Sequence, residues 1–153
     1  MDAKTRILVV DDDEVVRLGF VRSLTSVHRK VEATWNGIDA LRAMERDPFD
    51  VVLLDIRMLG ADGMTVLRTI KEKWPDSEVV IITGYPTLET AKEAVRLGVH
   101  DYLSKPLGPD DIINVADSAM QHKLWALRKD RTNQDQGTGA SSGSRRQTSS
   151  QAY

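Results

Sequence analysis

The sequence contains no cysteine, which excludes disulfide bonds, thiolate metal sites and cysteine nucleophiles. It also lacks a long hydrophobic run, because the apolar stretch in the N-terminal MDAKTRILVV is too short for a signal peptide or a membrane span. Neither charge sign predominates, since 21 basic and 23 acidic residues leave a net charge of -2. Nothing in this balance favours nucleic acid or an anionic membrane as the main partner. We therefore predict one cytoplasmic domain in 153 residues.

The C-terminal segment lacks large apolar side chains. Residues 130–153 contain no Ile, Leu, Val, Met, Phe or Trp and consist mostly of Ser, Thr, Gly and Gln. Such a segment cannot bury enough apolar surface to offset the entropy lost when its backbone is ordered. The composition predicts a disordered tail over residues 130–153.

The rest of the chain alternates two hydrophobic patterns. Short β-branched runs without polar alternation are typical of strands buried on both faces of a parallel sheet. Such runs lie at 7–10, 51–54 and 79–82, and weaker strands are predicted at 30–34 and 101–104. A segment with helical spacing follows each strand. Five strand–helix pairs in strict alternation predict an α/β fold, a doubly wound five-stranded parallel sheet with helices on both faces.

Polar residues stand where the predicted strands end, and ligands bind at this edge of an open α/β sheet. They are the acidic residues 11–14 after the first strand, Asp55 after the third, Thr83 at the end of the fourth and Lys105 after the fifth. A helix cap explains one acidic residue of the four. Asp55 ends a fully apolar strand, where desolvating a charge is costly. Carboxylates grouped with a hydroxyl and an ammonium suit Mg²⁺ and a phosphoryl group.

Two families place acidic residues in this way. An apolar strand followed by Asp-x-Asp-x-Val resembles the nucleophile motif of the haloacid-dehalogenase-like phosphatases. In this alternative the chain would be a Mg²⁺-dependent phosphatase with Asp11 as its nucleophile. Against that alternative, the ordered chain is short, no later acidic motif supplies the metal, and Asp55 has no role.

The second resemblance extends over residues 5–122 and involves five motifs in order. They are ILVVDDD at 7–13, VVLLDIRM at 51–58, DGM at 62–64, VVIITGY at 79–85 and DYLSKP at 101–106. Together they resemble the receiver domain of bacterial two-component response regulators. The resemblance implies a flavodoxin-like (βα)5 fold with strand order 2-1-3-4-5. The chain departs from the family at Leu59, where Pro is usual, and Leu59-Gly60 therefore predicts a less rigid loop.

The resemblance also implies a role for each matching site residue. Asp55 would accept a phosphoryl group from a phosphohistidine of a sensor histidine kinase or phosphotransfer protein. Lys105 would pair with the phosphorylated aspartate, and a cis peptide bond would precede Pro106. The Mg²⁺ ligands would be Asp11, Asp12, Asp55 and the backbone carbonyl of Arg57. Such a domain is a signalling module in a phosphorelay and no enzyme beyond its own phosphorylation and slow dephosphorylation.

Thr83 and Tyr102 match the conformational switch of the family. Thr83 would bond to the phosphoryl group, and Tyr102 would then turn inward. The switch would act on the face formed by the fourth helix, fifth strand and fifth helix. On that face Lys92, Glu93 and Arg96 predict a weak homodimer.

The remaining predictions concern shielding, metals and the last helix. Arg57 and Tyr85 are bulky residues two positions beyond Asp55 and Thr83, and they predict a long-lived phosphoryl group. The three histidines, His28, His100 and His122, show no metal-ligand spacing and are predicted to lie at the surface or beside strands instead of binding metal. The last helix is predicted over residues 110–129, with 123–129 extending past the domain. This extension is either a frayed or self-capping end, or a dimerising or signalling helix. The chain would then be a stand-alone receiver or part of a larger regulator whose output domain or partner it controls.

Overall fold

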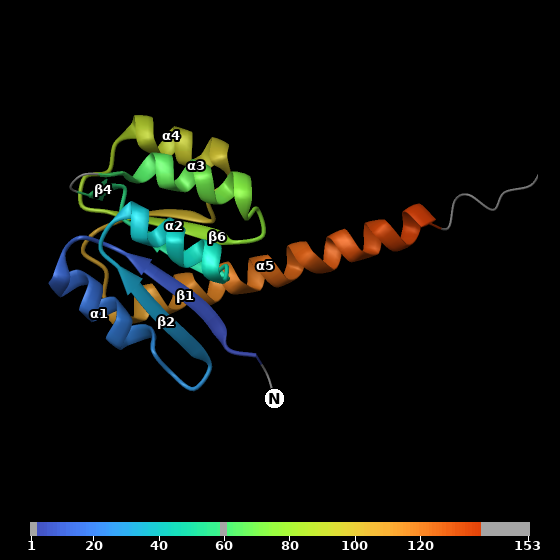
Figure 1. Ribbon diagram of the computed structural model, residues 1–153, viewed down its shortest axis with the longest axis horizontal. Helices are drawn as coiled ribbons and strands as arrows, with labels where there is room; N and C mark the ends of the chain where they lie inside the picture. The colour runs from blue at the N-terminus through green and yellow to red at the C-terminus, as the bar shows by residue number, and fades with distance from the viewer. Residues whose placement is uncertain (1–2, 59–60, 139–153) are drawn as a thin grey trace, which may run out of the picture.

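A parallel sheet of five strands forms the centre of the molecule (Figure 1). The computed structural model describes residues 3–58 and 61–138, so the Leu59-Gly60 prediction lies outside the described residues. The strands are β1 (Thr5–Val10), β2 (Arg29–Thr34), β3 (Val51–Leu54), β6 (Glu78–Thr83) and β7 (Asp101–Ser104). They are hydrogen-bonded in the order β2-β1-β3-β6-β7, which confirms the predicted order 2-1-3-4-5. A separate two-stranded sheet, β4 (Arg57–Met58) with β5 (Ala61–Asp62), was not predicted.

Helices cover both faces of the sheet. They are α1 (Glu14–Leu24), α2 (Gly37–Arg46), α3 (Gly63–Lys73), α4 (Leu88–Leu97) and α5 (Pro109–Thr138). Buried side chains of α2, α3 and α4 belong to one hydrophobic cluster, and those of α1 and α5 belong to a second. The predicted doubly wound α/β architecture is therefore confirmed.

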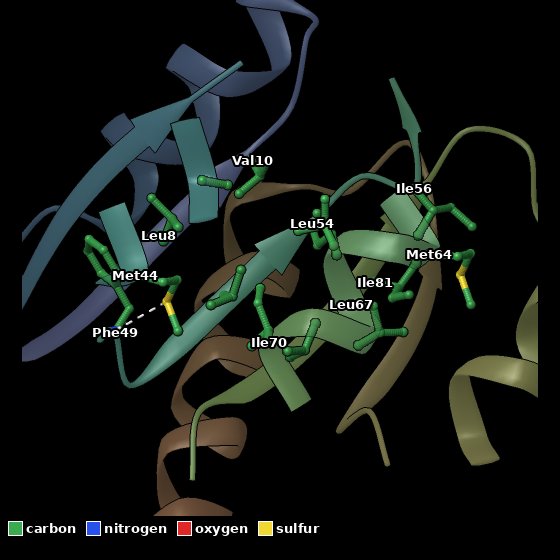
Figure 2. Close-up of a cluster of buried hydrophobic side chains, with 14 of the residues drawn as sticks. Leu8, Val10, Met44, Phe49, Leu54, Ile56, Met64, Leu67, Ile70 and Ile81 are labelled. Atoms are coloured by element: carbon green, nitrogen blue, oxygen red, sulfur yellow. Dashed lines mark hydrogen bonds between the residues drawn. The ribbon is translucent and has the colours of Figure 1, made fainter. Parts of the chain in front are cut away.

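The two clusters divide the side chains of each central strand. In β1, Leu8 and Val10 belong to the first cluster, whereas Ile7 and Val9 belong to the second. Figure 2 shows the first cluster, in which strand residues contact side chains of α2 and α3. All four of these β1 residues are at most 1% exposed, because helices cover both faces. This double burial explains why the β1 sequence has no polar alternation.

Helix α5 is longer than the sequence predicted. It continues to Thr138, whereas the predicted end was at residue 129. Each residue added to an existing helix gains a backbone hydrogen bond, so the helix continues past residue 129 although residues 130–136 are exposed. The predicted tail is therefore helical at its beginning, and residues 139–153 lie outside the described residues. Among the described helices, none is both long and apolar enough to cross a membrane.

Candidate functional site

The carboxyl ends of four strands bring the predicted site residues together. Asp11 follows β1, Asp55 follows β3, Thr83 ends β6 and Lys105 follows β7. The backbone N–H of Asp55 donates to the carbonyl of Val10 at 2.9 Å, and that of Lys105 donates to the carbonyl of Thr83 at 2.8 Å. Parallel pairing therefore continues just past the strand ends and fixes the spacing of these side chains.

Lys105 joins the two buried carboxylates. Its Nζ lies 2.7 Å from Oδ2 of Asp11 and 3.1 Å from Oδ2 of Asp55. Asp11 is 2% exposed and Asp55 is 5% exposed. The expected cis peptide bond between Lys105 and Pro106 is present. The ammonium group of Lys105 therefore contacts both Asp11 and Asp55, which were predicted to follow separate strands.

The pKa values of this group respond to burial and to the pairing. Burial raises the pKa of Asp11 above 3.8, although hydrogen bonds from Lys105 and from the N–H of Asp13 act in the opposite direction. For Lys105, burial alone would lower the pKa, but the hydrogen bonds and negative charges of Asp11 and Asp55 outweigh it and raise the pKa above 10.5. The fold therefore stabilises the protonated, positively charged form of Lys105.

Three carboxylates gather at this edge of the sheet. One oxygen each from Asp11, Asp12 and Asp55 lies within 4.8 Å of the other two. With the aspartates ionised, Lys105 neutralises only one of the three charges. Hard oxygen ligands with a surplus of negative charge fit a cation such as Mg²⁺. The donor set of this chain is therefore chemically suited to the predicted metal.

The other two acidic residues of the run have structural positions. Asp13 is the N-cap of α1, and its carboxylate accepts a hydrogen bond from the N–H of Val16 at 3.2 Å. Glu14 lies in the first turn of α1, where a negative charge complements the helix dipole. Helix capping accounts for Asp13 and the helix dipole for Glu14. Asp11 and Asp12 remain as candidate site residues.

Thr83 and Tyr102 both make hydrogen bonds around the start of α4. Thr83 is fully buried, and its Oγ1 accepts from the N–H of Tyr85 at 3.1 Å. The hydroxyl of Tyr102 lies 2.7 Å from Oγ1 of Thr90 and accepts from the N–H of Thr87 at 3.2 Å. Tyr102 is half-buried in this position. The sequence did not predict that the first turn of α4 holds the tyrosine, because a threonine cap gives no sign of a distant partner.

Arg57 and Tyr85 form a pair at the mouth of the site. The guanidinium carbon of Arg57 lies 4.3 Å from the centroid of the Tyr85 ring. Both residues line a hollow that also contains Asp55 and Lys105. In addition, the N–H of Arg57 donates to Oδ1 of Asp55 at 3.0 Å. The two residues to which the sequence assigned a common shielding role therefore contact each other beside Asp55.

Gly63 belongs to the DGM motif at 62–64, but the sequence indicated no role for it in supporting the site. A Cβ at this position would overlap the Cα of Ile56 and lie 2.8 Å from the carbonyl oxygen of Asp55. The N–H of Gly63 donates to the carbonyl of Ile56 at 3.3 Å. The start of α3 therefore packs directly on the backbone that carries Asp55, and only a residue without a side chain fits there.

Replacing Gly63 with alanine should displace the loop that carries Asp55. Backbone atoms cannot yield as a side chain does, so we expect the variant to lose about 1–3 kcal/mol of folding free energy. Urea unfolding measures this loss, and Gly19→Ala is the matched control because nothing lies within 4 Å of a Cβ at position 19. Equal losses for both variants would contradict the close approach.

The predicted dimer residues are partly engaged within the chain. Oε1 of Glu93 lies 2.6 Å from Nη2 of Arg68 on α3 and 4.0 Å from Nη2 of Arg96. Glu93 and Arg96 border a shallow hollow on α4 together with Lys92. Glu93 is therefore less available to a second molecule than its sequence position indicated.

Sequence comparison gives a family match and several relatives. The model of the response regulator receiver domain matches residues 7–117. The chain is 36% identical over 114 residues to the DNA-binding transcriptional regulator NtrC of Klebsiella pneumoniae, covering 74% of this chain and 24% of the relative. It is 34% identical over 109 residues to a putative NtrX-like response regulator of Rickettsia felis, covering 70% of this chain and 23% of the relative. The chain thus spans about a quarter of the length of these curated relatives.

Solved structures agree with these matches. NtrX from Brucella abortus in complex with ADP superposes with a TM-score of 0.78 at 31% identity, over 84% of this chain and 30% of that chain. The receiver domain of NtrX from Brucella abortus gives a TM-score of 0.70 at 34% identity, over 75% of this chain and 98% of that chain. The family match includes the acidic run on which the phosphatase alternative rested, and these comparisons give no support to Asp11 as a phosphatase nucleophile.

Proposed function

Because the chain belongs to the response regulator receiver domain family, we propose that it accepts a phosphoryl group on Asp55 and transmits the change through Thr83 and Tyr102. The observation that carries this proposal is the position of Asp55. Asp55 directly follows the buried strand β3, and its carboxylate is 5% exposed and lies 3.1 Å from the ammonium group of Lys105. A buried carboxylate beside a fixed cation is well placed to react with an anionic group and to stabilise the product.

The reaction would be an in-line phosphoryl transfer from a phosphohistidine. A carboxylate oxygen of Asp55 attacks phosphorus, the new oxygen–phosphorus bond forms, and the phosphorus–nitrogen bond of the donor breaks. The electron pair of that bond stays on the donor imidazole, which takes up a proton from solvent. Lys105 is placed to neutralise phosphoryl oxygens, while the N–H of Arg57 holds Oδ1 of Asp55 in position.

The proposed cofactor is Mg²⁺. Asp11, Asp12, Asp55 and the backbone carbonyl of Arg57 would hold it. When bound, the ion supplies positive charge to the phosphoryl oxygens, as divalent cations do in phosphoryl transfer. Lys105 and the N–H of Asp13 hold the Asp11 carboxylate at 2.7 and 2.9 Å, so this ligand is oriented in advance.

The switch would involve exchanging hydrogen bonds at both hydroxyl groups. Thr83 must release the N–H of Tyr85 to turn its hydroxyl toward a phosphoryl oxygen. Tyr102 must then leave Thr90 and the N–H of Thr87, which its hydroxyl contacts at 2.7 and 3.2 Å. Loss of these contacts would free the first turn of α4. The proposed output is therefore a change at the face formed by α4, β7 and α5.

A threonine-to-alanine change tests the switch. We expect Thr83→Ala to accept the phosphoryl group from a small phosphodonor but to leave the Tyr102 ring where it is, because the bond that draws Thr83 inward is lost. The ring resonances of Tyr102, followed by NMR before and after labelling, report the result. Thr83→Ser, which keeps the hydroxyl, should behave like the wild type. A Tyr102 response of wild-type size in Thr83→Ala would rule out the coupling.

The Arg57–Tyr85 contact leads us to propose that phosphorylated Asp55 is long-lived. The guanidinium carbon of Arg57 lies 4.3 Å from the centroid of the Tyr85 ring, and both side chains border the hollow that contains Asp55, where they would hinder an attacking water. We expect Tyr85→Ala and Arg57→Asn to lose the phosphoryl group roughly tenfold faster, which corresponds to about 1.4 kcal/mol of activation free energy. Decay of labelled protein measures this, and Tyr85→Phe, which keeps the ring, is the control. Unchanged decay in both variants would exclude shielding.

The proposed partners are a sensor histidine kinase or a histidine phosphotransfer protein, in the cytoplasm. A weak homodimer through the α4-β7-α5 face is a further proposal. Lys92 and Arg96 are exposed, while Glu93 is shared with Arg68. Exposed ion pairs contribute only ~0–1 kcal/mol each, so the dimer would be sensitive to salt. The receiver would control an output domain or a partner protein. It would not itself bind nucleic acid or a membrane.

A further inference from the structure

At the sheet edge opposite the acidic site, two histidines and a glutamate lie together. Glu78 begins β6, His100 precedes β7 and His122 lies on α5. One potential ligand atom from each side chain lies within 4.8 Å of the other two. No metal-ligand spacing is visible in the sequence, because Glu78, His100 and His122 belong to different parts of the fold.

The carboxylate of Glu78 is buried in this group. Glu78 is 6% exposed, and its Oε1 lies 2.8 Å from Nδ1 of His122. A single hydrogen bond to a partly exposed imidazole offsets only part of the cost of burying a carboxylate. A cation bound between the three side chains would neutralise the charge directly.

The two imidazoles are placed as metal ligands commonly are. Their ring centroids are 5.5 Å apart, and Nε2 of His100 lies 3.0 Å from Oγ of Ser118. A hydroxyl partner of this kind orients a ligating histidine and fixes which nitrogen carries the proton. The side chain of His122 is 50% exposed, so an ion and its water can reach the group from solvent.

We propose that Glu78, His100 and His122 form a binding site for a divalent transition-metal ion, with Zn²⁺ as the probe of choice. Two nitrogens and one carboxylate oxygen are a donor set that Zn²⁺ accepts while keeping a fourth position for water. With bonds of about 2.0–2.2 Å, a tetrahedral Zn²⁺ holds its ligand atoms about 3.3–3.6 Å apart. The ligand atoms of the three side chains lie within 4.8 Å of one another, so side-chain rotation would have to bring them to this spacing. The acidic site offers only oxygen atoms and prefers harder ions, so the two sites select different metals.

A metal at this position would anchor α5 where it leaves the domain. Beyond His122 the helix continues to Thr138 and projects away from the sheet (Figure 1). The same turn is also held by Lys123, whose Nζ lies 2.7 Å from Oδ1 of Asp50. A bound ion would join this turn to β6 and to the segment before β7, and so fix the direction of the projecting helix. This inference does not depend on phosphorylation of Asp55.

Calorimetric titration with Zn²⁺ tests the site in the full chain freed of any histidine tag. Excess Mg²⁺ is present to compete at the acidic site. We expect one Zn²⁺ per chain for the wild type and at least roughly tenfold weaker binding for His100→Gln and His122→Gln. His28→Gln is the matched control, because His28 is exposed in the turn between α1 and β2 and lies outside the group. Equal Zn²⁺ affinity in all four proteins would overturn the proposal.

NMR of the histidine side chains in the wild type gives a second measurement that needs no variant to fold. Adding Zn²⁺ should shift the imidazole nitrogen signals of His100 and His122 and leave those of His28 unchanged. Shifts confined to residues around the acidic site would place the ion there instead and would also overturn the proposal. Absence of any Zn²⁺ binding would have the same consequence.

Discussion

Replacing Asp55 with asparagine is expected to abolish labelling by a small phosphodonor such as acetyl phosphate. The amide oxygen is a far weaker nucleophile than the carboxylate, and the amide also removes one negative charge from the proposed Mg²⁺ site. The carboxylate of Asp55 is buried and held by the ammonium of Lys105 and the N–H of Arg57, and the asparagine side chain at this position offers no carboxylate oxygen to the donor. Labelling of the wild type should likewise fall sharply when a chelator removes Mg²⁺.

Asp13→Asn is the matched control for this experiment. Asparagine caps a helix as well as aspartate does, so α1 should be preserved while one nearby carboxylate is lost. We expect the control to be labelled like the wild type. Labelling of Asp55→Asn at the level of Asp13→Asn would contradict the assignment of Asp55 as the acceptor.

Replacing Lys105 with methionine should have the largest effect on stability. The change keeps the length of the side chain but leaves Asp11 and Asp55 buried beside each other without the ammonium that pairs with both. Removing one partner of a buried ion pair costs about 3–5 kcal/mol, and we expect about 2–4 kcal/mol here because 17% of the Lys105 side chain is exposed. Urea unfolding at neutral pH measures the loss.

The double variant Asp11→Asn/Lys105→Met is the control for this destabilisation. It removes one of the two repelling charges, so it should recover much of the stability that Lys105→Met loses. Full loss in the double variant would show that packing of the lysine stem, and not its charge, accounts for the effect.

The difference in stability between wild type and Lys105→Met should depend on pH. The pKa of Lys105 is raised above 10.5 in the folded protein, so its stabilisation is present below 10.5 and is lost as pH rises through the folded value. In acid, Asp11 becomes protonated as the pH falls through its pKa, which is raised above 3.8. Protonation removes the negative charge with which Lys105 pairs. We therefore expect a plateau at intermediate pH and a smaller difference at both extremes.

The position of the site could be predicted because it follows from strand ends. Parallel strands finish at one edge of the sheet, so Asp11, Asp55, Thr83 and Lys105 had to meet once the strands were recognised. Uninterrupted apolar runs such as Val51–Leu54 identified those strands by their burial on both faces. The fold class was confirmed for this reason, and the strand order, which the family resemblance implied, was confirmed as well. The roles of the site residues stay predictions.

Contacts between side chains distant in sequence could not be predicted. The stacking of Arg57 on Tyr85 and the bond from Tyr102 to Thr90 depend on the path of loops, which hydrophobic periodicity does not describe. The close approach of Gly63 to the backbone of Ile56 is likewise a tertiary contact. The end of α5 was misplaced because composition indicates what a segment can bury, but not how far an existing helix continues.

Chemical identification of the labelled residue tests the central claim most directly. An acyl phosphate is reduced by borohydride, which converts the aspartate that carries it to homoserine, and mass spectrometry of peptides then locates the change. After labelling with a small phosphodonor and Mg²⁺, we expect homoserine at Asp55 and at no other position. Homoserine at Asp11, Asp12 or Asp13 would contradict the account, and modification of Asp11 would favour the phosphatase alternative.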